Sequence, residues 1–117
     1  MTKSERASQI WTVLAWAARN RQILSYGLLA KLVGAPPAAL GAWLEPIQSH
    51  CLLEGLPRLT TLVVQQGTGL PGAGFTAASA SELAAQQLAV LDFDWLARGN
   101  PGADALEAAV QQRPSNG

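Results

Sequence analysis

The side chains that could take part in acid–base or nucleophilic chemistry are few in this sequence. The single histidine, His50, stands directly before the single cysteine, Cys51. A histidine can activate a thiol by taking its proton, but neighbours on a helix point about 100° apart and do not face each other. We therefore expect no nucleophile–base pair here, and we interpret Cys51 as a small buried hydrophobic residue.

A second candidate group is the pair Asp92 and Asp94, which flank Phe93. Paired carboxylates could share acid–base work or hold a cation. A solvated helix end, or an acidic patch for a partner, accounts for the same residues without chemistry, and we favour that interpretation. No Cys/His/carboxylate cluster has zinc-ligand spacing. We expect no metal, no cofactor and no enzymatic activity.

Length and composition predict one domain with a real core, because 49% of the 117 residues are hydrophobic and 14% are charged. The formal net charge is zero, with eight basic and eight acidic side chains. Six of the basic and three of the acidic residues lie in residues 1–66, so this part is basic and the remainder is acidic. A single cysteine allows no internal disulfide, which fits a cytoplasmic setting, and no apolar run approaches the roughly 20 residues that cross a bilayer.

The elements around these residues centre on a helix-turn-helix in residues 25–44. Ser25 can cap a helix from Tyr26 to Val33, and Gly34 follows it where the turn needs a positive φ. Pro36-Pro37 can start a second helix, which Pro46 should stop or kink before a further helix that ends at Gly55. The motif should bury the following side chains: Leu29, Ala30, Val33, Leu40 and Trp43.

The rest of the chain predicts one strand and three more helices. A helix should run from about Ser4, its N-cap, to Asn20, and Leu59 to Gln66 should be a strand because it is rich in β-branched residues. The glycine-rich run from Gly67 to Phe75 suits a tight hairpin or an irregular wing. Helices should follow from Ser81 toward Trp95 and from Ala103 to Gln112, with a frayed tail from Arg113.

These elements predict a mainly α fold with a small β-hairpin (α+β), in which residues 1–117 form a single domain. It would be a winged helix-turn-helix with extra C-terminal helices: the motif in about 25–44, the strand and wing in about 59–75, and the helical extension in about 81–112.

The order Ser25-Tyr26-Gly27-x-x-Ala30-x-x-x-Gly34, a second helix, a strand ending in Val63-Val64 and a turn ending in Gly74-Phe75 resembles a known domain. It is similar to the DNA-binding winged helix of O6-alkylguanine-DNA alkyltransferases and alkyltransferase-like proteins, over roughly Leu24 to Phe75. That family carries Pro-Cys-His-Arg, or Pro-Trp-His-Arg in non-catalytic relatives, where this chain has about Leu59-Thr60-Thr61-Leu62. The acceptor thiol is absent, so the resemblance implies the scaffold and not alkyl transfer.

The first functional hypothesis is a non-enzymatic winged-helix protein that binds double-stranded DNA, a small regulator. Phosphate contacts would come from the basic side chains, with the glycine-rich wing lying along the DNA backbone. Against this hypothesis stands the second helix of the motif, which begins Pro-Pro-Ala-Ala, whereas base readout usually draws on Arg, Lys, Asn or Gln. The predicted DNA-binding residues are Arg19, Arg21, Lys31, Pro37, Ala38, Arg58, Gln65 and Gln66.

The alternative is a protein-binding module on the same scaffold, such as an accessory or inhibitor subunit of a host or phage defence complex. Aromatic side chains dominate the energetics of many interfaces, and the predicted anchors are Trp11, Trp16 and Trp95. Trp11 and Trp16 lie about 140° apart on one helix, so one core cannot readily bury both. We therefore expect a homodimer through the first helix or through the Asp92–Trp95 region.

Overall fold

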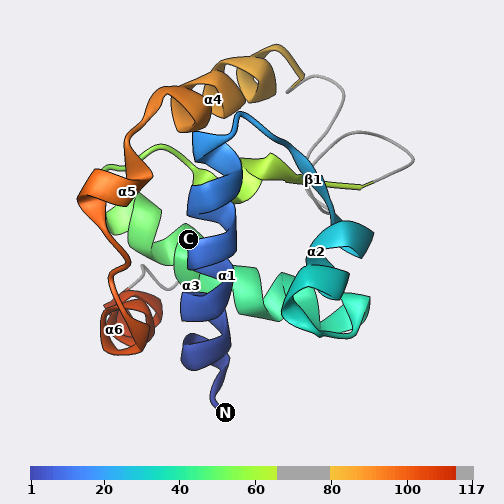
Figure 1. The fold of residues 1–117 in the computed structure, drawn as a ribbon. Coiled ribbons are helices and arrows are strands. Elements are labelled where there is room, and N and C mark those ends of the chain that lie inside the picture. The colour runs from blue at the N-terminus through green and yellow to red at the C-terminus, as the bar shows by residue number, and fades with distance from the viewer. Residues whose placement is uncertain (66–79, 113–117) are drawn as a thin grey trace.

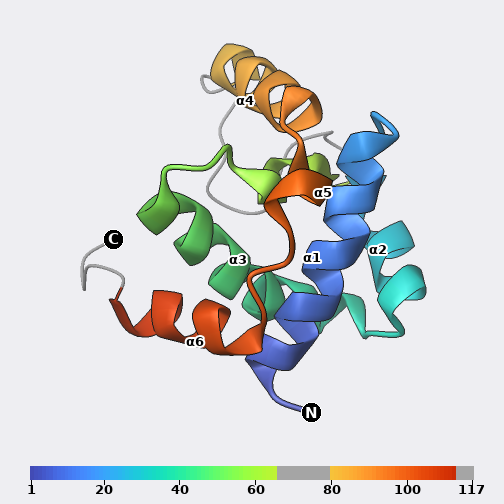
Figure 2. The ribbon, with the colours of Figure 1, turned by 60° about the vertical axis from the view of Figure 1, so that its left-hand side comes forward.

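The computed structural model describes residues 1–65 and 80–112, which are mainly helical with one small two-stranded sheet. This agrees with the predicted α+β class. Figures 1 and 2 show α1 running through the structure, crossed by α3 and flanked by α6. The elements in order are α1 (Lys3–Arg19), β1 (Leu24–Ser25), α2 (Tyr26–Val33), η1 (Pro37–Ala39), α3 (Leu40–Glu54), η2 (Leu59–Leu62), β2 (Val63–Val64), α4 (Ala80–Asp92), α5 (Trp95–Arg98) and α6 (Ala103–Gln112).

The first helix begins two residues earlier than predicted, because its N-cap is Thr2 and not Ser4. The Thr2 hydroxyl accepts a hydrogen bond from the Glu5 amide at 3.1 Å, and the Glu5 carboxylate accepts one from the Thr2 amide at 2.9 Å. This reciprocal pair is a capping box. Ser4 was expected to be the cap; it lies inside the helix instead, where its hydroxyl donates to Glu107 on α6 at 2.6 Å.

The helix pair α2 and α3 follows the prediction at its turn but not at Pro46. The Ser25 hydroxyl caps α2 by accepting from the Leu28 amide at 3.1 Å, and Gly34 ends the helix with a φ of 67°. The alternative that Pro46 stops the helix is wrong, since α3 continues from Leu40 to Glu54 with this proline inside it. A proline inside a helix costs about 3 kcal/mol, but Pro46 is buried in a helix that packs on both α1 and α6. Packing outweighs the local penalty.

No single helix in the described ranges is long and apolar enough to cross a membrane. The segments Tyr26–Val33 and Pro37–Glu54 reach that length and hydropathy only together, and they are bent by 100° relative to each other.

The predicted strand over Leu59–Gln66 is only partly present. Leu59–Leu62 forms the 3-10 helix η2, and only Val63–Val64 is extended. Burial explains the difference, because Leu59, Thr61 and Leu62 are all buried, whereas a half-buried strand would alternate. The pairing also differs from a hairpin: β2 lies parallel to β1, with Leu24 opposite Val63 and Ser25 opposite Val64. The glycine-rich run predicted to be the wing lies outside the described residues.

The C-terminal helices cover opposite ends of α1. The chain does not continue as one helix from α4 to Trp95: α4 ends at Asp92, and α5 begins separately at Trp95 with Asp94 as its N-cap. Helix α6 spans Ala103–Gln112, as predicted. Figure 1 shows α4 beside the C-terminal end of α1 and α6 beside its N-terminal half. The tail from Arg113 and the side chain of Ser81 lie outside the described part.

Candidate interaction surface and pocket

The connection between α2 and α3 has the geometry that the sequence predicted for a helix-turn-helix. The two helical segments are bent by 100° across a short turn, and the turn is closed by hydrogen bonds from the amides of Gly34 and Ala35 to the Ala30 carbonyl. Such motifs join two helices at about 90–120° through a turn of three or four residues. Leu29, Ala30 and Leu40 are buried, while Val33 and Trp43 are half-buried against the core.

The outward side of this helix pair is apolar. We define the motif face as the exposed residues Leu28, Lys31 and Leu32 of α2 with Pro37, Ala38 and Gly41 at the start of the second segment. Leu28 and Leu32, one helical turn apart, are 45% and 56% exposed. Lys31 carries the only charge of this set, and no residue between Pro36 and Leu44 is charged. The motif face therefore offers apolar contact and backbone groups rather than base-reading side chains.

The N-terminal end of the second segment is not neutralised by side chains. Neither Pro36 before η1 nor Ala39 before α3 provides a side-chain cap, and the first turn has no acidic residue. Pro36 and Pro37 have no amide hydrogen, and the Ala39 amide donates to the Pro36 carbonyl at 3.0 Å, so this end offers an anion the Ala38 amide and the helix dipole. The predicted contacts Pro37 and Ala38 lie at this end and are exposed.

The predicted phosphate-binding cations do not gather on one surface. Arg19 and Arg21 lie at the end of α1 beside Asp92 of α4, whereas Lys31 belongs to α2, which Figure 1 shows on another side. Arg21 already has partners, since it contacts the Asp92 carboxylate at 3.1 Å and donates to the Leu91 carbonyl at 3.4 Å. Arg58 and Gln65 are exposed, and Gln66 lies outside the described residues.

The two neighbouring aspartates have separate structural roles. Asp92 pairs with Arg21, and Asp94 accepts a hydrogen bond from the Ala97 amide at 3.1 Å as the cap of α5. This agrees with the favoured interpretation of a helix end, and it supplies no acid–base pair.

Two of the three tryptophans predicted to anchor a partner belong to the core. Trp11 and Trp95 are buried, and their rings meet edge to face with centroids 5.6 Å apart. The Trp95 indole donates to the Val90 carbonyl at 2.8 Å. The prediction of surface anchors at Trp11 and Trp95 is therefore wrong, because the core formed by α1, α3, α4 and α5 encloses both rings. Trp16 is 61% exposed and remains accessible.

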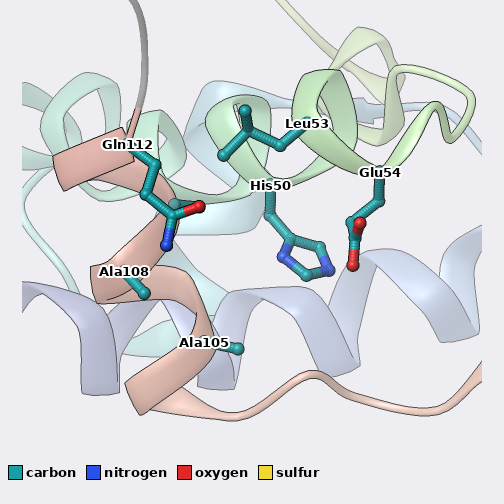
Figure 3. Close-up of a pocket in the computed structure, with 7 residues that line it drawn as sticks. His50, Leu53, Glu54, Ala105, Ala108 and Gln112 are labelled. Atoms are coloured by element: carbon teal, nitrogen blue, oxygen red, sulfur yellow. The ribbon is translucent and has the colours of Figure 1, made fainter.

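A pocket of about 190 Å³ lies between α3 and α6. Figure 3 shows the His50 imidazole projecting from α3 into it, with the Glu54 carboxylate alongside and alanines of α6 opposite. The polar residues of its lining are His50, Glu54 and Gln112, and the apolar ones are Leu53, Ala105, Ala108 and Ala109. His50 is only 8% exposed, and its ring meets the Trp11 ring edge to face at 5.6 Å.

The charges around this pocket come from α3 and α5. Burial lowers the pKa of His50, and Arg98 adds to the shift while Glu54 opposes it, so the imidazole is neutral at pH 7. Arg98 approaches the Glu54 carboxylate at 3.9 Å. Burial raises the pKa of the Cys51 thiol to about 11, so this side chain stays protonated, as expected for a buried residue. Within residues 1–65 and 80–112, no three His, Cys, Asp or Glu side chains are placed to hold a metal ion.

Sequence reasoning weighed His50 only against Cys51 and missed Glu54, its neighbour in the pocket on the same face of α3. The signal was present, because His50 and Glu54 stand four residues apart and residues at that spacing share a helix face. The α6 side of the pocket had no such signal, since alanines on a helix do not reveal what they pack against.

Comparisons of the chain with protein-family models, with curated proteins and with solved structures found no match. The motif face and the α3–α6 pocket are therefore the two features from which function is inferred.

Proposed function

We propose that this chain is a non-enzymatic winged-helix protein that binds double-stranded DNA through the sugar–phosphate backbone, with little selectivity for base sequence. The observation that carries the proposal is the α2–α3 pair, bent by 100°, with the start of the second helix exposed. In helix-turn-helix proteins this end of the second helix enters the major groove.

Backbone contact is supported by the chemistry of that end. The uncapped helix start attracts a phosphate through its dipole and the Ala38 amide, and small side chains at Ala38 and Gly41 allow a close approach. Lys31 on the adjacent helix adds a flexible positive charge. Low selectivity follows from the uncharged stretch between Pro36 and Leu44, which has no Arg, Lys, Asn or Gln to read a base edge.

Fluorescence anisotropy with labelled duplexes of two unrelated sequences tests this function. We expect similar affinities for both, and a slope of log K against log salt of about −2 to −4, because few phosphates are contacted and each contributes roughly −0.9. Lys31→Gln should weaken binding and reduce the slope by about one. Lys3→Gln serves as the matched control, since Lys3 pairs with Glu45 at 3.2 Å and lies outside the motif face. Absence of binding at about 10 µM protein in low salt would rule the proposal out.

A second candidate function is protein binding through the same scaffold, as in an accessory or inhibitor subunit of a defence or phage complex. The exposure of Leu28, Leu32 and Trp16 favours it, because large exposed apolar side chains are typical of interaction sites.

A further inference from the structure

The α3–α6 pocket combines a polar end with an apolar wall. Its polar end is formed by His50 and Glu54, which project into the same space from one face of α3 (Figure 3). The opposite wall is formed by Ala105, Ala108 and Ala109 of α6. Pockets that bind small molecules have this composition, mostly apolar with a few polar groups that orient the ligand.

His50 is 8% exposed as a residue, and no group in the described part of the chain forms a hydrogen bond with its ring. Its ring nitrogens are not fully enclosed, since the described polar side-chain atoms that are both enclosed and unpartnered are Trp11 Nε1, Ser49 Oγ and Gln86 Oε1. A ring nitrogen that reaches the pocket without a protein partner bonds to water in the free protein and is available to orient a ligand. A neutral imidazole has one nitrogen that accepts a hydrogen bond. Glu54 adds a carboxylate, of which Arg98 approaches only Oε1, at 3.9 Å.

These acceptors suit a ligand with donors and a positive charge, and the alanine wall suits a short hydrocarbon next to them. We propose that the pocket binds a primary ammonium group carried on a short unbranched alkyl chain. The ammonium donates to Glu54 Oε2 and to the accepting nitrogen of His50, while the alkyl chain lies against Ala105 and Ala108. The same chemistry is offered by a free alkylamine and by a lysine side chain of another protein.

This site lies at the C-terminal end of α3, whereas the motif face lies at its N-terminal end. The experiments on ammonium binding and on DNA binding therefore test separate sites, and a negative result in one does not decide the other.

Proton NMR is a direct probe, because His50 is the only histidine and its ring signals need no separate assignment. We would titrate n-butylammonium, n-butanol and butyrate, which share an alkyl chain and differ in the head group, at about pH 7.5, where the imidazole is neutral. The ammonium should shift the His50 signals saturably, n-butanol should bind about tenfold more weakly, and butyrate should not bind. A titration with Nα-acetyl-lysine amide distinguishes a protein lysine from a free alkylamine as the natural ligand. If this compound binds more strongly than n-butylammonium, the ligand is a protein lysine, and if it binds more weakly, the ligand is a free amine.

Three variants locate the site. Glu54→Gln should weaken n-butylammonium binding about tenfold because it removes the carboxylate charge, whereas Glu45→Gln, on the same helix but outside the pocket, should leave it unchanged. Ala108→Leu fills the pocket and should abolish the shift. If Ala108→Leu lowers the melting temperature, the comparison of Glu54→Gln with Glu45→Gln still tests the site. Both glutamate side chains reach solvent, so neither substitution should disturb the fold.

The pH dependence gives an independent readout. The groups facing the His50 ring are Glu54 on α3, Arg98 on α5 and the uncharged Trp11 ring on α1, while α6 lines the pocket with uncharged residues. As pH falls through the lowered pKa of His50, the imidazolium repels the ligand, so ammonium affinity should fall. An equal response to all three head groups, a preference for butyrate or no saturable shift would overturn the proposal.

Discussion

At the scale of single residues, two positions with positive φ, Gly34 and Arg21, differ in their expected backbone strain. Gly34 ends α2 at φ 67°, where glycine is unstrained, whereas Arg21 follows the end of α1 at φ 54° and is the one non-glycine residue of the described chain with positive φ. The Arg21 side chain pairs with Asp92, so the residue links α1 to α4 in spite of its backbone.

Gly34→Val tests the turn. A β-carbon at this position would meet no heavy atom within 4 Å, so the cost arises from backbone strain alone. We expect a β-branched residue there to lower the free energy of unfolding by more than about 1 kcal/mol. Gly41→Ala is the matched control: Gly41 is helical, exposed and also free of contacts, so alanine should stabilise by about 0.5–1 kcal/mol. Similar urea denaturation midpoints for both variants would mean that Gly34 is not the turn residue.

Arg21 allows strain and ion pairing to be separated. Arg21→Ala removes the exposed ion pair and keeps a β-carbon at positive φ, whereas Arg21→Gly removes both the pair and the strain. Since the loss of the pair is common to both variants, the glycine variant should be more stable by about 1 kcal/mol. Thermal unfolding of the two proteins measures this, and an alanine variant of equal or greater stability would show that the backbone is not strained.

At the scale of elements, α1 depends on a cap that sequence reasoning placed two residues late. Thr2→Ala removes the hydroxyl that accepts from the Glu5 amide and should lower stability by about 1 kcal/mol. The hydrogen bonds to Thr2 hold the pKa of Glu5 below its usual value, so part of the stability is lost as pH falls through that lowered pKa. In Thr2→Ala the Glu5 pKa measured by NMR should rise toward the ordinary range, and an unchanged value would count against the capping box.

At the scale of the whole molecule, self-association tests the protein-binding alternative. Trp11 and Trp95 are in the core, so of the predicted anchors only Trp16 can mediate a homodimer. Sedimentation at two concentrations about a hundredfold apart should show dimers at the higher one, because association follows mass action. Trp16→Ala should shift the equilibrium toward monomer, and Leu96→Ala, which truncates an exposed side chain on α5, should not. A monomer at both concentrations would exclude the homodimer.

The sequence by itself determined the features that depend on neighbouring residues. Helix α2 begins after Ser25 and ends at Gly34, because a side-chain cap and a positive φ each act within one helical turn. Helix α6 also begins and ends at the predicted residues. The mainly helical class followed in the same way from periodic apolar residues.

Only the tertiary structure decided what depends on distant contacts. Pro46 stays inside α3 because α1 and α6 pack on that helix, and Leu59–Leu62 becomes a 3-10 turn because its side chains are buried without alternation. The same holds for Trp11 and Trp16, which both lie on α1. Only Trp11 is packed against other rings, those of His50 and Trp95. The pocket beside His50 likewise exists only where α6 crosses α3. Helix periodicity shows which residues share a face of a helix. It does not show which other helix packs on that face, because that depends on residues far away in the sequence.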